Sequence, residues 1–452
     1  MIARFSPPQV LVVGAGPAGA TAARVLAAGG TPVRILDRSA FPRNKPCGGG
    51  ISMRALVRFP YLERELSRIA THFVSRLYLE GPDGDSAVID SRRQATLMVR
   101  RIEFDALLLS LAEAAGAEVI GGADVVQARE THDRVTLTTR DGRRFEAPIV
   151  IAADGVHSVV ARRLGLNRGW NASEVALDMM EETPRTALRD LDPSALWVAY
   201  GYDPANADRG LRNADRNPQS PRNPQSSTRS GAAPEGYAYI FPKRDHVNIG
   251  IGYVLSHYRK NVDAAPYDLQ RGLVARLRER GIVDGESVRA NFTPFIIPVG
   301  GPLRNPARGR VLLAGDAGGF VNGFTAEGIY YAMVSGDLAA RAVLRTAGDP
   351  SALAPEYRRA CDYEIGAELR DSVAIQHVLF ADRRRIARVI DGAQREAAMT
   401  RLIVDFAAGG GSYRALRRRL LARSPRLAGH LIWERISRLA PNNLVVERGP
   451  VF

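Results

Sequence analysis

Cysteine is scarce in this chain of 452 residues, and the scarcity bears on its compartment. Only Cys47 and Cys361 occur, far apart in the sequence. Two distant thiols provide no disulfide framework of the kind that staples secreted domains, and they fit a reducing cytoplasm. The seven histidines show no spacing typical of metal ligands. We therefore expect a cytoplasmic protein with no metal site.

Long apolar runs are also absent. No window reaches the roughly 18 consecutive apolar residues that a transmembrane helix needs. The short apolar run at residues 10–13 leads into a glycine-rich turn instead of a cleavage site. The sequence thus predicts no signal peptide and a mature chain that begins near Met1.

Lysine is also scarce, since only three of the 62 basic residues are lysines. The net charge of +14 therefore comes almost entirely from arginine. An arginine-rich surface suits phosphate or an anionic membrane, although the base composition of a genome can also enrich arginine. We expect no nucleic-acid partner. A cluster of arginines near the C-terminus forms either a solvated helix face or a peripheral contact with anionic lipid at the inner membrane face; it comprises Arg414, Arg417, Arg418, Arg419 and Arg423.

The remaining composition is that of an ordinary globular protein. Hydrophobic residues make up 45% and charged residues 24% of the chain, which excludes a disordered or collagen-like protein. At roughly 150 residues per domain, the length indicates about three structural units.

The opening of the chain has the pattern of a βαβ unit. Residues 10–13 form an apolar run, 14–19 a glycine-rich turn, 20–28 an alanine-rich stretch and 32–36 a second apolar run. These features predict strand, turn, helix and strand.

Further elements follow the same rules. Apolar spacing predicts helices at 101–115 and 327–344, and apolar runs predict buried strands at 118–120, 148–152 and 311–314. A small meander is expected at 125–127, 135–139 and 144–147. After residue 350 the chain has helical spacing at 353–406 and 413–439, broken by the glycines at 409–411.

A second sheet is indicated by segments that alternate polar and apolar residues, at 73–79, 195–202 and 237–251. We expect this sheet to be antiparallel. Residues 206–234, which contain Arg-Asn-Pro-Gln-Ser twice, cannot bury a core and predict a mobile insertion.

A GxGxxG motif links the first predicted strand to the first predicted helix. Gly14 permits the tight turn, Gly16 lets a pyrophosphate approach the backbone, and Gly19 permits close packing of the helix. Asp37 stands 18 residues after Gly19, at the end of the second strand, where an acid binds ribose hydroxyls. The sequence therefore predicts a dinucleotide site.

Four markers in order resemble the flavoprotein superfamily typified by p-hydroxybenzoate hydroxylase. They are the GxGxxG at 14–19, Arg-x-x-Phe-Asp at 101–105, Ala-Asp-Gly-Val-His-Ser at 153–158 and Gly315-Asp316. The resemblance implies FAD as cofactor, with Arg101 and Asp316 at its pyrophosphate and ribityl chain. It associates the Asp154-Gly155 turn with FAD and reduced nicotinamide.

Three segments resemble one branch of that superfamily, the geranylgeranyl reductases. They are Lys-Pro-Cys-Gly-Gly-Gly-Ile-Ser at 45–52, Pro-Glu-Gly-Tyr-Ala-Tyr-Ile-Phe-Pro at 234–242, and the block at 315–331. Tyr239 stands where that family usually has tryptophan, and Gly323 and Ala326 stand where proline and glycine are common.

The resemblance implies a set of site residues. Cys47, Gly48 and Gly49 lie in the stretch expected beside the flavin ring, and Cys47 is the side chain expected to hydrogen-bond or donate a proton. The expected cofactor-binding residues are Gly14, Gly16, Ala18, Gly19, Asp37, Arg38, Cys47, Gly48, Arg101, Asp154, Gly155, Gly315, Asp316, Gly328 and Ile329.

The expected substrate residues are Tyr237, Tyr239, Phe241 and Pro242. The three aromatic residues alternate on a strand and so face one side. They either line a prenyl pocket or form an ordinary sheet core.

These features predict an α/β fold in which a Rossmann-like FAD-binding domain of the glutathione-reductase-2 type is interleaved with an antiparallel-sheet substrate domain. We expect the FAD-binding domain at residues 1–70, 101–170 and 295–350. The substrate domain is expected at 71–100 and 171–294, and a C-terminal helical region at 351–452.

The predicted function is reduction of carbon–carbon double bonds in a geranylgeranyl or polyprenyl chain of a lipid, chlorophyll-type ester or quinone tail, with NADPH or NADH as donor. The first alternative is a monooxygenase or halogenase of the same fold. Gly319 replaces the histidine that many hydroxylases carry, and the Trp-x-Trp-x-Ile-Pro signature of halogenases is absent. The second alternative is a non-catalytic flavoprotein that binds a lipid or a partner through its basic tail.

Overall fold

The computed structural model describes residues 9–82, 86–91, 94–190, 192–202, 234–395, 400–401, 404–406 and 412–423. The expected insertion at 206–234 therefore lies outside the described residues except for Pro234. The glycine break at 409–411 and the predicted helix beyond residue 423 also lie outside them.

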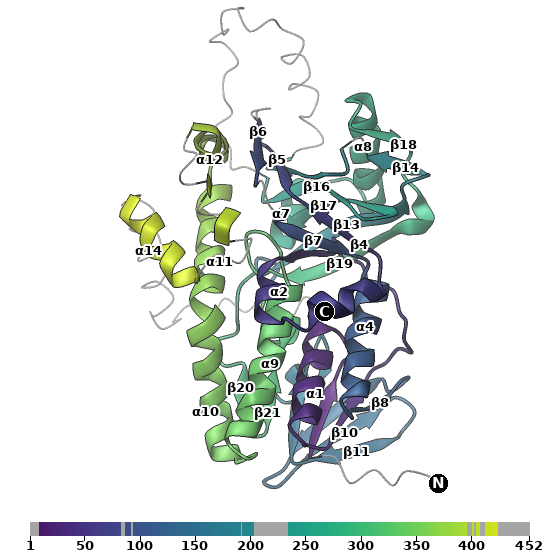
Figure 1. The fold of residues 1–452 in the computed structure, drawn as a ribbon, viewed down its shortest axis with the longest axis vertical. Helices are drawn as coiled ribbons and strands as arrows, with labels where there is room; N and C mark the ends of the chain where they lie inside the picture. The colour runs from purple at the N-terminus through teal and green to yellow at the C-terminus, as the bar shows by residue number, and fades with distance from the viewer. Residues whose placement is uncertain are drawn as a thin grey trace, which may run out of the picture.

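A six-stranded sheet forms the base of the molecule (Figure 1). Its order is β20-β21-β12-β1-β2-β8, and all neighbouring pairs are parallel except β20–β21. The strands are β1 (Val10–Val13), β2 (Val33–Leu36), β8 (Glu118–Ile120), β12 (Ile149–Ala152), β20 (Ala307–Arg308) and β21 (Val311–Leu313). β1 and β12 are buried along their whole length, as continuous apolar runs in a covered parallel sheet require.

Helices cover this sheet on one face and a meander covers the other. The helices are α1 (Pro17–Ala28), α4 (Arg101–Ala114) and α9 (Ile329–Arg345), and the meander consists of β9 (Val125–Glu130), β10 (Val135–Thr139) and β11 (Arg144–Ala147). The short helix α5 (Val159–Arg163) packs beside β9. α1 begins at Pro17, three residues before the predicted start, because proline is favourable in the first helical turn.

A seven-stranded sheet lies above the first in Figure 1, in the order β19-β13-β17-β16-β15-β5-β6. It is antiparallel except for the pair β5–β15. Its strands are β5 (Arg76–Glu80), β6 (Ser86–Asp90), β13 (Val175–Pro184), β15 (Ala195–Tyr200), β16 (Gly236–Pro242), β17 (His246–Val254) and β19 (Phe292–Pro298). The helices α7 (Leu255–Asn261) and α8 (Pro266–Glu279), with the small pair β14 (Leu188–Asp190) and β18 (Val283–Gly285), complete this part.

A three-stranded sheet of β3 (Gly50–Ser52), β7 (Thr96–Val99) and β4 (Thr71–Val74) contains strands from both predicted domains. The prediction of one strand over residues 73–79 is therefore wrong. The chain leaves β4 after Val74 and enters β5 at Arg76, because β4 pairs with β7 whereas β5 pairs with β6 and β15. The short helices α2 (Arg54–Arg58) and α3 (Leu62–Glu65) follow β3.

The described residues of the C-terminal part are helical, as predicted, and run along one side of both sheets (Figure 1). It consists of α10 (Pro350–Cys361), a π-helical turn (Asp362–Gly366), α11 (Ala367–Phe380), α12 (Arg383–Arg395) and α14 (Tyr413–Arg423). Cys361 is buried together with Ile365, Leu369 and Val373, which makes it an ordinary core position. None of the helices within the described ranges is long and apolar enough to span a bilayer.

Candidate active site

The glycine-rich turn after β1 is open at one of its three glycines. A Cβ at Gly14, which has φ +94°, would lie 2.3 Å from the carbonyl oxygen of Ala153, and one at Gly19 would lie 1.9 Å from that of Gly14. Gly16 has φ −72°, and the nearest atom to its hypothetical Cβ is Nη2 of Arg43 at 3.7 Å. Packing thus requires Gly14 and Gly19, whereas a Cβ at Gly16 would meet no closer atom than Arg43, at a helix N-terminus of the kind that can hold a phosphate group.

Asp37 ties the end of β2 to this turn. Its carboxylate accepts hydrogen bonds from the backbone N–H of Ala15 at 2.7 Å and of Ser39 at 2.8 Å. Arg38, next in the chain, is exposed. Ala18 is buried where α1 meets α9, and a Cβ at Gly336 would lie 2.1 Å from its carbonyl oxygen. The small side chains therefore bring α1 and α9 into close contact behind the turn.

Asp154 follows β12, and its two carboxyl oxygens differ in their hydrogen bonding. Its Oδ2 accepts from the N–H groups of Val159 at 2.8 Å and Val160 at 3.2 Å. Its Oδ1 is buried and has no hydrogen-bond partner among the described residues. Burial raises the pKa of Asp154 above its usual range. An acceptor that is buried without a partner fits a site that a polar group of a cofactor completes.

Asp316 lies in a turn at the end of β21, and Gly328, which precedes α9, lies next to it. A Cβ at Gly328 would lie 3.6 Å from Oδ1 of Asp316, and the N–H of Gly315 donates to Oγ of Ser335 at 2.9 Å. Ile329 is buried as the first residue of α9. The carboxyl ends of β1, β2, β12 and β21 thus meet at one edge of the sheet, which is where open α/β sheets bind ligands.

Arg101 and Asp105 form a buried ion pair beside these turns. The guanidinium donates two hydrogen bonds of 2.7 Å to the carboxylate, and Arg43 adds a contact of 3.2 Å to Asp105. The guanidinium of Arg101 also lies close to the side chain of Cys47. Burial lowers the pKa of Lys45 to about 8, and the nearby charge of Asp316 opposes this shift. The segment 43–47 therefore lies beside both the Arg101–Asp105 ion pair and the turn at Asp316.

The Cys47–Gly49 loop lies between the two large sheets. A Cβ at Gly48 would lie 2.5 Å from the ring of Phe241, and one at Gly49, which has φ +74°, would lie 2.1 Å from the carbonyl oxygen of Val99. Sγ of Cys47 accepts from the N–H of Gly49 at 3.4 Å. The carbonyl oxygen of Cys47 accepts from Nζ of Lys243 at 3.4 Å and from Nδ2 of Asn248 at 3.3 Å. Only glycine fits at both positions, so the loop contacts β16 directly.

The aromatic residues of β16 face one side, as predicted. Ring centroids are 6.0 Å apart between Tyr237 and Tyr239 and 4.5 Å apart between Tyr239 and Phe241. The alternate residues Ala238 and Ile240 pack into the core on the other face. Pro242 ends the strand.

Two further rings extend this row. Tyr200 lies 5.4 Å from Tyr237 and stacks on Phe324 at 4.9 Å. We refer to Tyr200, Tyr237, Tyr239, Phe241 and Phe324 as the aromatic wall. Because Gly48 lies against Phe241, the aromatic wall begins at the Cys47–Gly49 loop.

Sequence reasoning missed the polar residues that hold this loop. Lys243 forms an ion pair with Glu182, which also pairs with Arg100 at 2.9 Å. Asp178 shares the face of β13 that carries Glu182 and contacts Tyr239. The available signal was the even spacing of Asp178 and Glu182, two of the three carboxylates in this strand, which places both on one face.

A polar cavity of about 230 Å³ opens beside the loop. Its charged and ionisable lining residues are Lys45, Arg100, Glu182 and His246. The described residues contain no group of three or more His, Cys, Asp or Glu side chains that could hold a metal ion.

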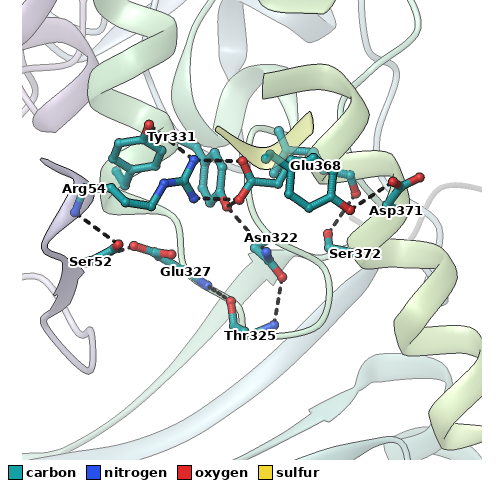
Figure 2. A network of polar contacts seen from close by, with 12 residues as sticks. Ser52, Arg54, Asn322, Thr325, Glu327, Tyr331, Glu368, Asp371 and Ser372 are labelled. Atoms are coloured by element: carbon teal, nitrogen blue, oxygen red, sulfur yellow. Dashed lines mark hydrogen bonds and ion pairs between the residues drawn. The ribbon is translucent and has the colours of Figure 1, made fainter. Parts of the chain in front are cut away.

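A buried network joins the block after β21 to the C-terminal helices (Figure 2). Arg54 forms hydrogen bonds of 2.6 and 2.9 Å with Glu368, and the Tyr331 hydroxyl donates to Glu368 at 2.7 Å. Glu327 accepts from the N–H of Ser52 at 3.1 Å, and burial raises its pKa to about 7. The network fixes β3 and the neighbouring Cys47–Gly49 loop relative to α11.

The arginines of α14 differ in their surroundings. Arg417 pairs with Asp371, and Arg414 donates to the carbonyl oxygen of Tyr363 at 3.2 Å. Arg418 and Arg419 are exposed. The side chain of Arg423 lies outside the described residues.

Residues 8–210 match the family model described as an FAD binding domain. The chain is 33% identical over 364 residues to the menaquinone reductase of Mycobacterium tuberculosis, covering 78% of this chain and 81% of that protein. It is 29% identical to the chloroplastic geranylgeranyl diphosphate reductase of Oryza sativa, covering 74% and 66% of the two chains. A geranylgeranyl bacteriochlorophyll reductase-like protein from Thermoplasma acidophilum has the same fold, with a TM-score of 0.70, 19% identity and coverage of 94% and 98%.

Proposed function

Because the chain belongs to the geranylgeranyl reductase family of FAD-dependent oxidoreductases, we propose that it reduces carbon–carbon double bonds of a geranylgeranyl or polyprenyl chain. The observation that carries this proposal is the 33% identity to a menaquinone reductase over 81% of that protein. The substrate class includes a prenyl lipid, a chlorophyll-type ester or a quinone tail.

The FAD site is proposed at the carboxyl edge of the parallel sheet. The free space at Gly16 would receive the pyrophosphate, and the unpartnered Oδ1 of Asp154 would accept from the cofactor. Asp316 and Arg101 would lie along the ribityl chain and the pyrophosphate. Reduced FAD supplies a hydride. We propose NADPH or NADH as the source of those electrons.

The substrate site is proposed along the aromatic wall. A prenyl chain needs a dry, elongated apolar surface, and each buried CH₂ contributes about 0.8 kcal/mol. The rings of Tyr237, Tyr239 and Phe241 supply such a surface next to the Cys47–Gly49 loop. An anionic headgroup would meet Lys45 and His246 in the cavity, where Glu182 is paired with Arg100 and Lys243.

Contact with a membrane surface is the remaining proposal. A prenyl lipid or quinone resides in a bilayer, and the exposed Arg418 and Arg419 on α14 offer two positive charges that no described carboxylate neutralises by an ion pair. Such residues attract anionic headgroups at about 1 kcal/mol each.

The function is tested by anaerobic incubation of the purified, FAD-reduced protein with geranylgeranyl diphosphate and, separately, with menaquinone. We expect mass spectrometry to show a gain of two hydrogens per reduced double bond, with return of the oxidised-flavin absorbance. No gain without oxygen, together with incorporation of oxygen or halogen in air, would overturn the proposal in favour of the monooxygenase or halogenase.

The same assay tests the role of the loop. Cys47→Ala removes the sulfur that Arg101 and Gly49 contact, and we expect turnover to fall at least tenfold while FAD content stays normal. Cys361→Ala is the matched control, since that thiol lies in the helical core and should leave turnover unchanged. Equal turnover in both variants would contradict the placement of the site at Cys47.

A further inference from the structure

A buried carboxyl group lies on the same sheet face as the aromatic wall. Asp178 of β13 is 7% exposed, and both of its oxygens lie 3.1 Å from the hydroxyl of Tyr239, which donates to them. Tyr239 stands where the family signature usually has tryptophan, so this chain places a hydroxyl where an indole ring is common. The pair therefore combines an acid and a hydrogen-bond donor inside an otherwise apolar surface.

Two glycines of β17 allow the pair to form. β17 lies between β13 and β16, with Gly250 opposite Tyr239 and Gly252 opposite Asp178. A Cβ at Gly250 would lie 2.6 Å from the Tyr239 hydroxyl, and one at Gly252 would lie 3.6 Å from Oδ1 of Asp178. The tyrosine can reach across β17 only because Gly250 has no side chain.

The same face leads from Asp178 to the Cys47–Gly49 loop. Asn248 contacts Sδ of Met180 at 3.6 Å and donates to the carbonyl oxygen of Cys47 at 3.3 Å. The ring of Phe241 lies 4.5 Å from that of Tyr239 and touches Gly48. A chain lying along the aromatic wall toward the loop would therefore pass the Asp178 carboxyl.

The surroundings of Asp178 favour its protonated form. Burial raises its pKa to about 7, against the opposing effect of the Tyr239 hydrogen bond. On one side of Asp178, across Gly252 of β17, lies Tyr237. On the other side lies Phe295 of β19, and Nζ of Lys45 is 3.4 Å from the centroid of that ring. On the strand of Asp178 itself, Glu182 is already paired with Lys243.

We propose that Asp178 is the proton donor for the double bond that the enzyme reduces, and that Tyr239 is a positioning residue that orients its carboxyl. This inference rests on the proposed function. An isolated alkene accepts a hydride poorly unless its other carbon gains a proton, so the reaction requires an acid. The sulfur of Cys47 accepts from the N–H of Gly49 and lies close to Arg101, which gives it a role in holding the loop.

The reaction balances with these groups. Asp178 transfers its proton to one carbon of the double bond, and the other carbon receives the hydride from reduced FAD. The π bond is lost, two C–H bonds form, and FAD is oxidised by two electrons. Asp178 remains as a carboxylate and regains a proton from solvent before the next turnover.

Asp178→Asn in the holoenzyme is the direct test. We expect the turnover number to fall roughly a hundredfold to ten-thousandfold, the range for loss of a general acid, with little change in KM or in reduction of the flavin by dithionite. In the unaltered protein, turnover should decline as pH rises through about 7, because the protonated fraction of Asp178 falls. That decline should be absent from the residual activity of Asp178→Asn.

A second readout does not depend on activity. Infrared difference spectra of the protein without substrate, recorded across a pH range centred on about 7, should show the C=O stretch of Asp178 together with that of Glu327, whose pKa burial also raises to about 7. Asp178→Asn should remove the Asp178 band and leave the Glu327 band in place. Glu181→Gln is the matched control, because Glu181 is a buried carboxyl on the opposite face of β13, bound by Ser287 and Val288, and its replacement should leave both the Asp178 band and turnover in place.

Three outcomes would count against the proposal. Turnover of Asp178→Asn at the unaltered rate overturns the assignment of Asp178 while the proposed function stands. Loss of turnover in Asp178→Asn with no change in the carboxyl signal that titrates near neutral pH also overturns it. Failure of the unaltered protein to reduce any prenyl substrate overturns the proposed function, and with it this inference. Tyr239→Phe, which keeps the ring and the carboxyl, should lower turnover less than Asp178→Asn and shift the pH at which the Asp178 band titrates.

Discussion

At the scale of single residues, the three glycines of the GxGxxG motif have different surroundings. A side chain at Gly14 or Gly19 would clash with the backbone, because a backbone oxygen lies within 2.3 Å of the hypothetical Cβ at each position. A side chain at Gly16 would not clash, because the nearest atom to its hypothetical Cβ is 3.7 Å away and its φ of −72° suits any residue. A glycine that the protein itself does not need points to a ligand that needs the space.

Gly16→Ala should therefore separate folding from cofactor binding. We expect the free energy of unfolding of the FAD-free protein to change by no more than about 0.5 kcal/mol, as for a substitution without strain. FAD at 100 times its Kd should stabilise the unaltered protein by about 2.7 kcal/mol, and Gly16→Ala should lose much of this gain at the same FAD concentration. The measurement is chemical unfolding with and without FAD.

Gly19→Ala is the control, because it should destabilise the protein in both conditions through the contact with the Gly14 carbonyl oxygen. Retention of the full FAD stabilisation by Gly16→Ala would show that the pyrophosphate does not approach the backbone there.

At the scale of elements, the network in Figure 2 links segments that are distant in the sequence. Arg54 lies on α2 just after β3, and Glu368 lies 314 residues later on α11. Their side chains are only 11% and 4% exposed. Removing one member of a buried ion pair leaves the other without compensation, which costs more than the pair contributes.

Glu368→Ala should accordingly lower the free energy of unfolding by about 3–5 kcal/mol, because it leaves the Arg54 guanidinium and the Tyr331 hydroxyl without their acceptor. The double substitution Arg54→Met with Glu368→Leu should recover much of that loss. Urea unfolding of the single and double variants measures both.

The exposed pair Arg189–Asp284, at 65% and 69% exposure, supplies the comparison. Asp284→Ala should change the free energy of unfolding by at most about 1 kcal/mol. A cost for Glu368→Ala no larger than this would mean that the network does not hold α2 against α11.

At the scale of the whole molecule, the proposed contact with a membrane depends on which positive charges remain exposed. The net charge is +14, yet many arginines are used in ion pairs, including Arg417 with Asp371 on α11. Arg418 and Arg419 remain exposed on α14, at the side of the molecule formed by the C-terminal helices (Figure 1).

The double substitution Arg418→Glu with Arg419→Glu should weaken binding to vesicles that contain anionic lipid. At about 1 kcal/mol per residue near the surface, loss of two positive charges predicts roughly a thirtyfold drop in affinity, and the charge reversal adds to it. Flotation with anionic and with neutral vesicles, at low and high salt, measures the effect. Equal binding of the unaltered protein to both kinds of vesicle would remove the role proposed for these arginines.

Local patterns were sufficient for much of the architecture. The apolar run at β1, the glycine-rich turn and α1 were predicted within a few residues, because periodicity and turn chemistry are properties of neighbouring residues. The alternation of Tyr237, Tyr239 and Phe241 on one face was also confirmed. The division into domains and the roles of the individual site residues stay predictions.

The sequence by itself determined the βαβ unit, the row of alternate aromatic residues on β16 and the resemblance to the geranylgeranyl reductases. Each of these depends on residues that are only a few positions apart. Only the tertiary structure decided that Phe241 lies against Gly48 and that Tyr239 meets Asp178 across Gly250. Asp178 and Tyr239 are 61 residues apart in the chain, and their contact depends on the order and register of three strands. Pairing between distant strands is set by the packing of the whole sheet, so no local pattern contains it.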